Sequence, residues 1–149
     1  MAQRAYSETN LHIVWHVKDN QPALSDEIKT PLYRHLRDRA LPQPGVFWHD
    51  VGGTHDHIHM AVSVPPTVTP SEWIGDLKGA SAHYINHVIA NRKMLEWQVG
   101  YGIVSFGTKD LPWVLEYVRD QPQHHAAGTT HERLERAEAD EDEKPGEPG

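Results

Sequence analysis

Two histidines separated by a single residue, His57 and His59, carry the clearest chemical signal in this sequence. They lie in a segment where apolar and polar residues alternate, which is typical of a β-strand. Because side chains alternate across a strand, both imidazoles project from one face while Ile58 projects from the other. Imidazole is the commonest protein ligand of metal ions, so the pair can hold one divalent ion if a third ligand comes from elsewhere. Taken alone, the pattern is equally consistent with a polar strand face whose histidines are solvated.

A second pair, Tyr117 and Gln121, lies four residues apart in a segment with helical periodicity, so both side chains share one helix face. A tyrosine hydroxyl can act as a covalent nucleophile, and a glutamine carbonyl oxygen is an acceptable ligand for a hard cation. Without further information the structural interpretation is favoured, in which Tyr117 packs beside Trp113 and Gln121 is solvated. Pro122 follows directly and disfavours a helical conformation at the residue before it, so this helix is expected to end near Gln121.

The elements that must position these residues follow from periodicity and from capping and breaking residues. Strands are expected at 11–17, 46–51, 57–64 and 101–106, and helices at 26–41, 70–89 and 110–121. Gly52 and Gly53 are expected to form a turn between the second and third strands. The order of the first six elements predicts an α+β, ferredoxin-like fold, an antiparallel sheet backed by two helices. The seventh element is an appended C-terminal helix that carries the tyrosine.

The charge of the chain is unevenly distributed. The 149 residues include 14 basic and 21 acidic ones, and the formal net charge is −7. Eight acidic and three basic residues lie from position 129 onward, so residues 1–128 are nearly neutral. A nearly neutral domain can carry a local basic patch, but its charge does not indicate a large nucleic-acid footprint. Because the last segment has almost no apolar residues, we predict one domain at 1–128 and an acidic disordered tail at 129–149.

Several classes of protein are excluded by what the sequence lacks. It has no cysteine, which excludes a disulfide framework and thiolate metal sites. It has no run of about 18 apolar residues, as a membrane-spanning helix needs. The first nine residues are polar and lack the apolar stretch of a secretory signal. By elimination, we expect a cytoplasmic protein.

Taken together, the two chemical pairs and the segments around them resemble the single-tyrosine transposases of the HUH endonuclease superfamily, which small insertion sequences and REP-associated genes encode. The resemblance covers roughly residues 9–126. The segments that carry it are Leu11 to Trp15, Gly53 to His59, Leu77 to Ser81, Gly100 to Gly102, Tyr117 to Gln121, and His124 with His125.

This resemblance implies a fold, a site and a reaction. The implied fold is the same ferredoxin-like sheet, and the resemblance also implies a homodimer. The ligands of Mg²⁺ or Mn²⁺ would be His57, His59 and Gln121, and Tyr117 would attack DNA. The implied activity is cleavage and rejoining of single-stranded DNA with hairpin ends through a 5′-phosphotyrosine intermediate. The basic residues expected to contact phosphates are Lys78, Arg92, Lys93 and Arg119.

Two other hypotheses stay open at this point. The segment from His55 to Met60 also resembles the alternating motif of histidine-triad nucleotide hydrolases, in which a histidine is the nucleophile and no metal is needed. Asp56 stands where that motif has an apolar residue, and the hypothesis gives Tyr117 no role. The other alternative is a domesticated DNA-binding protein without catalytic activity, which would leave the tyrosine and the histidines without a chemical explanation.

Overall fold

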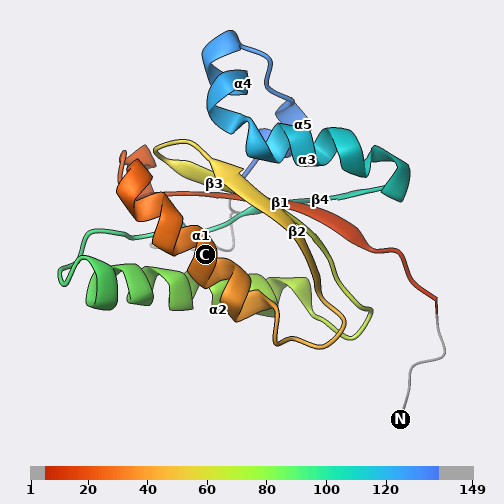
Figure 1. Cartoon of the computed structure of the whole chain (residues 1–149), viewed down its shortest axis with the longest axis horizontal. Coiled ribbons are helices and arrows are strands. Elements are labelled where there is room, and N and C mark those ends of the chain that lie inside the picture. Colours follow the sequence, from red (N-terminus) through yellow and green to blue (C-terminus); the bar gives the residue numbers. More distant parts are fainter. Residues whose placement is uncertain (1–5, 138–149) are drawn as a thin grey trace, which may run out of the picture.

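One four-stranded antiparallel sheet, in the order β2-β3-β1-β4, forms the centre of the molecule in the computed structural model, which describes residues 6–137 (Figure 1). The strands are β1 (Asn10–His16), β2 (Phe47–Gly53), β3 (His57–Ser63) and β4 (Gly102–Phe106). β1 and β3 are the central pair, and Val14 on β1 lies opposite His59 on β3. The predicted α+β ferredoxin-like fold is confirmed.

Two long helices, α1 (Asp26–Ala40) and α2 (Pro70–Tyr84), cover one face of this sheet (Figure 1). This face carries the apolar half of each central strand, and the sheet and both helices share one core cluster. Burying each large apolar side chain of this cluster stabilises the fold by about 1.5 to 3 kcal/mol. Fully buried members from these elements include Ile13, Trp15, Leu32, Leu36, Ile58, Met60, Val62, Ile74 and Leu77. The helix expected at 70–89 is regular only to Tyr84 and continues as a π-helical turn at Ile85–Ile89.

Three shorter helices cover the opposite face (Figure 1). They are α3 (Leu111–Arg119), α4 (Gln121–Ala127) and α5 (Glu132–Glu135), and 3-10 turns occupy Lys18–Asn20 and Thr108–Asp110. The single helix expected at 110–121 is therefore two helices, because the backbone leaves the helical conformation at Asp120 (φ −102°, ψ 31°). Pro122 was expected to end a helix. It lies instead in the first turn of α4, where a missing N–H costs little.

The prediction of a turn at Gly52 and Gly53 is wrong, since both residues belong to β2 and the turn follows at residues 54–56. The reason for glycine at position 52 is a close approach of α3. A Cβ on Gly52 would lie 1.9 Å from the carbonyl oxygen of Val118. Gly102 plays the same part on β4, where a Cβ would lie 1.7 Å from the carbonyl oxygen of Arg136. These two glycines allow the layer of α3, α4 and α5 to pack closely on the sheet.

Replacing Gly52 by alanine is accordingly expected to lower the free energy of unfolding by about 3 kcal/mol, the upper end for overpacking a filled interior. Gly75→Ala is the matched control, because a Cβ there meets nothing within 4 Å and alanine favours a helix interior. Urea denaturation of the two variants checks the difference. Equal midpoints would show that α3 does not press on β2.

Residues 129–137 differ from the expected disordered tail. The chain after α4 turns back over the sheet, and α5 brings Leu134 into a buried position that is 4% exposed. Leu134 is an isolated apolar residue in an acidic segment, which explains why composition gave no sign of this packing. The remainder of the predicted tail, 138–149, lies outside the described residues. Within 6–137, no helix is long and apolar enough to cross a membrane.

Candidate metal and tyrosine site

The paired histidines lie at the start of β3 on the sheet face that α3, α4 and α5 cover, and this layer removes them from solvent. The exposed fraction is 3% for His57 and 0% for His59. Their rings share one face as expected from alternation, with centroids 5.0 Å apart. The alternative of a solvated polar strand face is therefore wrong, because the face is buried under helices that the strand pattern does not reveal.

The ring of His57 is oriented by the turn that precedes β3. Its Nδ1 lies 2.7 Å from Asp56 Oδ1 and 2.8 Å from Thr54 Oγ1. The other nitrogen, Nε2, consequently points into the buried layer. A carboxylate that fixes one imidazole nitrogen while the other faces a site is a common outer-shell arrangement around metal ligands.

The ring of His59 is fixed in the same way by a histidine on the neighbouring strand. Its Nδ1 lies 2.7 Å from Nε2 of His12. Burial lowers the pKa of His12 to about 3 and that of His59 to about 4, so both rings are neutral at physiological pH. The buried Nε2 of His59 has no hydrogen-bond partner among the described residues, and a neutral imidazole nitrogen in that state is suited to a cation.

Tyr117 and Gln121 both reach the histidines, although they belong to different helices. The buried ring of Tyr117 packs edge-on against His59, with centroids 5.8 Å apart. Gln121 Oε1 lies 3.4 Å from His57 Nε2, while its Nε2 donates to the backbone carbonyl of Tyr117 at 3.0 Å. The helix break at Asp120 thus does not remove Gln121 from the site but leaves it buried there.

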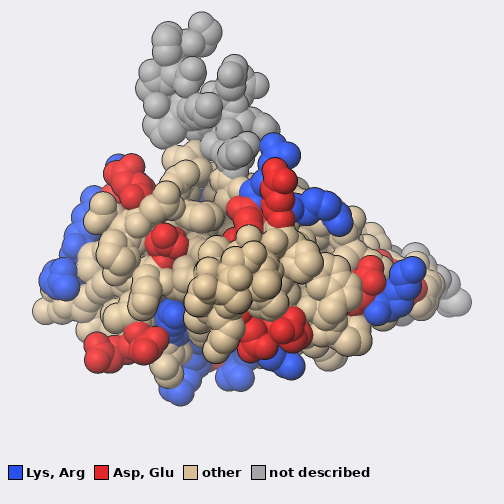
Figure 2. All heavy atoms as spheres, turned by 90° about the horizontal axis from the view of Figure 1, so that it is seen from above, with Lys and Arg blue, Asp and Glu red and all other residues tan. Residues whose placement is uncertain are grey.

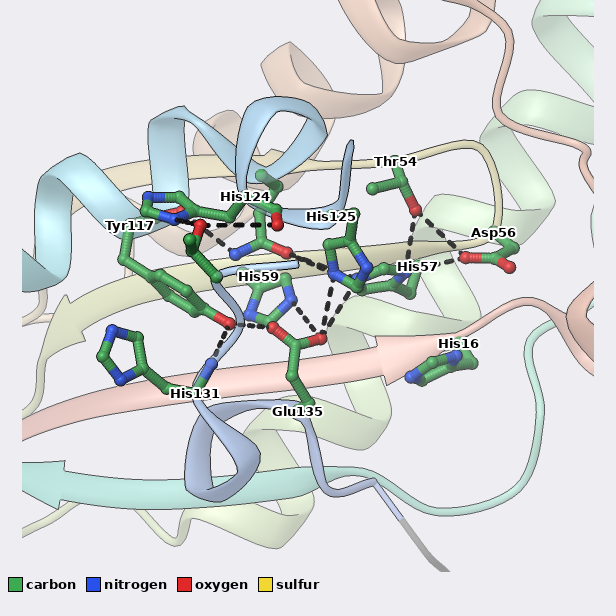
Figure 3. A network of polar contacts seen from close by, with 12 residues as sticks. His16, Thr54, Asp56, His57, His59, Tyr117, His124, His125, His131 and Glu135 are labelled. Atoms are coloured by element: carbon green, nitrogen blue, oxygen red, sulfur yellow. Dashed lines mark hydrogen bonds and ion pairs between the residues drawn. The ribbon is translucent and has the colours of Figure 1, made fainter. Parts of the chain in front are cut away.

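Two further residues to which the sequence analysis gave no role in the site point into the same space (Figure 3). His125 lies one turn after Gln121 on α4, with its Nε2 3.1 Å from Gln121 Oε1. Glu135, on α5, accepts a hydrogen bond from the Tyr117 hydroxyl. The i to i+4 spacing from Gln121 was a usable signal for His125. Nothing in the sequence indicated Glu135, which lies in the segment expected to be disordered.

The carboxylate of Glu135 dominates the electrostatics of the site. Burial opposes its charge, but contacts with His57 and His59 outweigh this and lower the pKa of Glu135. Burial also lowers the pKa of His57, yet its contacts with Glu135 and Asp56 leave it above its ordinary value. Burial and the hydrogen bond with Glu135 raise the pKa of Tyr117 to about 12. In this arrangement the tyrosine is a protonated phenol.

The donor atoms fit a divalent ion. His57, His59, His125 and Glu135 each present one ligand atom, and these atoms lie within 4.8 Å of one another. Imidazole nitrogens with carboxylate and amide oxygens suit first-row divalent ions. A pocket of about 500 Å³, which His16, Asn20 and Gln98 also line, borders Glu135.

The four basic residues predicted to contact DNA do not gather around this site. Lys78 lies on α2, on the other side of the sheet, and its ammonium donates to the carbonyls of Gln98 and Gly100 at 2.7 and 2.8 Å. Arg92 and Lys93 lie in the segment after the π-helical turn. Arg119 ends α3 and pairs with Asp50 on β2. On the face that Figure 2 shows, basic and acidic side chains are interspersed without one dominant basic patch.

The histidine-triad hypothesis finds no support in the geometry. His55 is exposed in the turn before β3, outside the strand that carries His57 and His59. A triad on one strand face would need its first histidine in the same ladder.

A ferredoxin-like sheet with a His-x-His pair on a central strand, faced by a helix tyrosine, is the arrangement expected of the HUH single-tyrosine transposases. The chain belongs to the family "Transposase IS200 like", whose family model matches residues 5–121. No curated protein sequence matches it significantly.

Two solved structures are similar in fold. The protein named "putative transposase" of Deinococcus radiodurans R1 is 20% identical, with a TM-score of 0.63, over 81% of this chain and 96% of that one. A REP-associated tyrosine transposase, solved bound to a REP hairpin, is 14% identical, with a TM-score of 0.60, over 87% of this chain and 75% of that one.

Proposed function

We propose that this transposase cuts and rejoins single-stranded DNA through a covalent bond to Tyr117, with a divalent ion held by His57, His59 and Gln121. The observation that carries the proposal is that the tyrosine hydroxyl and both histidine nitrogens lie around one point. The Tyr117 hydroxyl and the Nε2 atoms of both histidines meet at a single carboxylate, that of Glu135 (Figure 3). A nucleophile and a ligand cluster that face the same point can act on one phosphate.

The chemistry of the proposal balances within the chain and its substrate. The Tyr117 oxygen forms a bond to phosphorus while the bond from phosphorus to the 3′ oxygen of the preceding nucleotide breaks, which leaves a 3′-hydroxyl and a 5′-phosphotyrosine. A phenol, whose unperturbed pKa is about 10, is more acidic than an alcohol and therefore the better leaving group, so a 3′-hydroxyl can reverse the step without an external energy source. A bound Mg²⁺ or Mn²⁺ would neutralise the phosphate and orient it.

Single-stranded DNA with hairpin ends is the proposed substrate. The REP hairpin bound to the structurally similar REP-associated transposase supports it. Of the four basic residues proposed to contact DNA, only Arg119 lies on the helix that carries Tyr117, so we assign it first to a contact with a strand that enters the site. Its partner Asp50 would have to release it for that contact.

A homodimer is also part of the proposal and rests on the family resemblance. Within one chain the Tyr117 ring packs against His59, and a dimer could complete its sites with tyrosines from the same chain or from the partner. The edge strand β4 exposes Ile103, which is 38% accessible, and such an edge can pair with a second copy. Light scattering of the purified protein measures the mass directly.

A cleavage assay tests the function itself. Hairpin-bearing single-stranded DNA labelled at its 3′ end is expected to become attached to the protein with Mn²⁺ or Mg²⁺ present, and to remain free with a chelator. Gel electrophoresis under denaturing conditions separates the linked product. Hairpin binding without any linked product, across a panel of divalent ions and hairpins, would instead support the non-catalytic DNA-binding alternative.

A further inference from the structure

We propose that Glu135 and His125 are ligands of the metal ion, so that the C-terminal segment closes the site with a carboxylate when DNA is absent. This inference rests on the proposed function, because it concerns the same ion. It adds two ligands that the family resemblance does not supply, and both lie beyond the residues that the family model matches.

The first support is the spacing of the donor atoms. Oε1 of Glu135 lies 3.4 Å from Nε2 of His57, 3.3 Å from Nε2 of His59 and 3.2 Å from Nε2 of His125. Atoms that bind one ion at about 2.1 Å are themselves about 3.0 to 3.4 Å apart. The carboxylate oxygen therefore lies at a ligand-to-ligand distance from each of the three nitrogens, and all four donor atoms lie within 4.8 Å of one another.

The second support is the direction of the nitrogen lone pairs. The Nδ1 atoms of His57 and His59 are engaged by Asp56 and His12, so the Nε2 atoms face inward. To bind an ion, each histidine must carry its ring proton on Nδ1 so that the Nε2 lone pair is available, and the contact of His57 Nδ1 with the Asp56 carboxylate favours that tautomer. His59 Nε2 is fully buried and makes no hydrogen bond within residues 6–137 apart from its 3.3 Å contact with the Glu135 oxygen, so it is available to a metal ion.

The third support is that the segment is held over the site by contacts that need no metal. Leu134 is buried, and the carbonyl of Arg136 lies directly against Gly102 on β4. The N–H of His131 donates to the Tyr117 hydroxyl at 2.9 Å. A ligand on a pre-positioned segment costs little conformational entropy when it binds.

One consequence follows for DNA. The second oxygen of Glu135 accepts the hydrogen bond of Tyr117, so this carboxylate lies between the nucleophile and the metal ligands. The scissile phosphate would occupy the same space, and both groups are anions. DNA must therefore displace Glu135, which turns a closed site with protein ligands only into an open one.

Metal binding by the DNA-free full-length chain tests the inference separately from activity. Mn²⁺ is titrated into the protein and free Mn²⁺ is followed by electron paramagnetic resonance. We expect Glu135→Gln to weaken binding by about 10-fold or more, and His125→Ala to weaken it in the same direction. Glu132→Gln is the matched control, because it removes the same charge from the exposed side of the same helix. Equal affinities of wild type and Glu135→Gln would overturn the inference.

A second variant keeps every ligand and moves only the segment. Gly102→Ala places a Cβ against the Arg136 carbonyl, so it should lower Mn²⁺ affinity toward the value of Glu135→Gln. Hydrogen exchange gives a readout without DNA: Mn²⁺ should protect residues 129–137 in wild type and not in Glu135→Gln. Unchanged exchange of that segment in saturating Mn²⁺ would also overturn the inference. A wild type that binds no divalent ion would instead refute the metal site of the proposed function.

Discussion

Replacing Tyr117 by phenylalanine is expected to eliminate the covalent protein–DNA product, a loss on the order of 10⁴-fold or more in cleavage rate. The change removes one oxygen, which is the atom proposed to bond to phosphorus. The buried ring and its packing against His59 stay in place. Because the hydroxyl also bonds to Glu135 and to the N–H of His131, the free energy of unfolding should fall by about 1 to 2 kcal/mol, too little to unfold the domain.

Two other tyrosines provide the comparison. Tyr33→Phe is the control for loss of a hydroxyl, because Tyr33 Oη is buried on the other side of the sheet without a hydrogen bond to any described residue. Tyr101→Phe tests whether Tyr101, which lies between Gly100 and Gly102 immediately before β4, is the nucleophile instead. Mass spectrometry of trapped product should find the nucleotide on the peptide that contains Tyr117. A nucleotide on the Tyr101 peptide would show that the wrong residue was assigned.

Replacing His59 by alanine is expected to abolish both metal binding and cleavage. Loss of an outer-shell partner alone lowers metal affinity by about 10- to 100-fold, so loss of a direct ligand should cost more. Strand alternation alone predicts that this change leaves the fold intact, because it places the histidines away from the apolar strand face. The structure corrects that expectation. His59 is fully buried, and the cavity left by truncation should lower the free energy of unfolding by about 2 to 4 kcal/mol.

Stability must therefore be measured together with activity. His59→Gln keeps most of the volume and should lose metal affinity with a smaller loss of stability. His55→Ala is the matched control, since His55 is exposed in the adjoining turn. Calorimetric titration with Mn²⁺ and thermal unfolding separate the two effects. Wild-type cleavage by a folded His59→Gln variant in the presence of a chelator would contradict the metal-dependent mechanism.

Short-range sequence patterns were enough to predict the strands, the antiparallel sheet and the shared strand face of His57 and His59. Each follows from a short-range rule: alternation places both imidazoles on one strand face, and the order of elements fixes an antiparallel sheet with two helices behind it. The family motifs then linked Tyr117 to those histidines, which lie far from it in the sequence. The same residues meet in the structure, with the Tyr117 ring against His59.

Tertiary structure decided what covers the histidine face and which groups share it. His12 is one of several polar residues on β1, and only the register of β1 against β3 places it against His59. Glu135 lies in a segment whose composition predicts disorder, yet Leu134 and the glycine at position 102 dock that segment on the sheet. Local periodicity reports the faces of individual elements, whereas docking of a short acidic segment depends on a complementary surface that distant residues build. That surface exists only once the chain has folded, which is why the sequence did not predict Glu135 as a residue of the site.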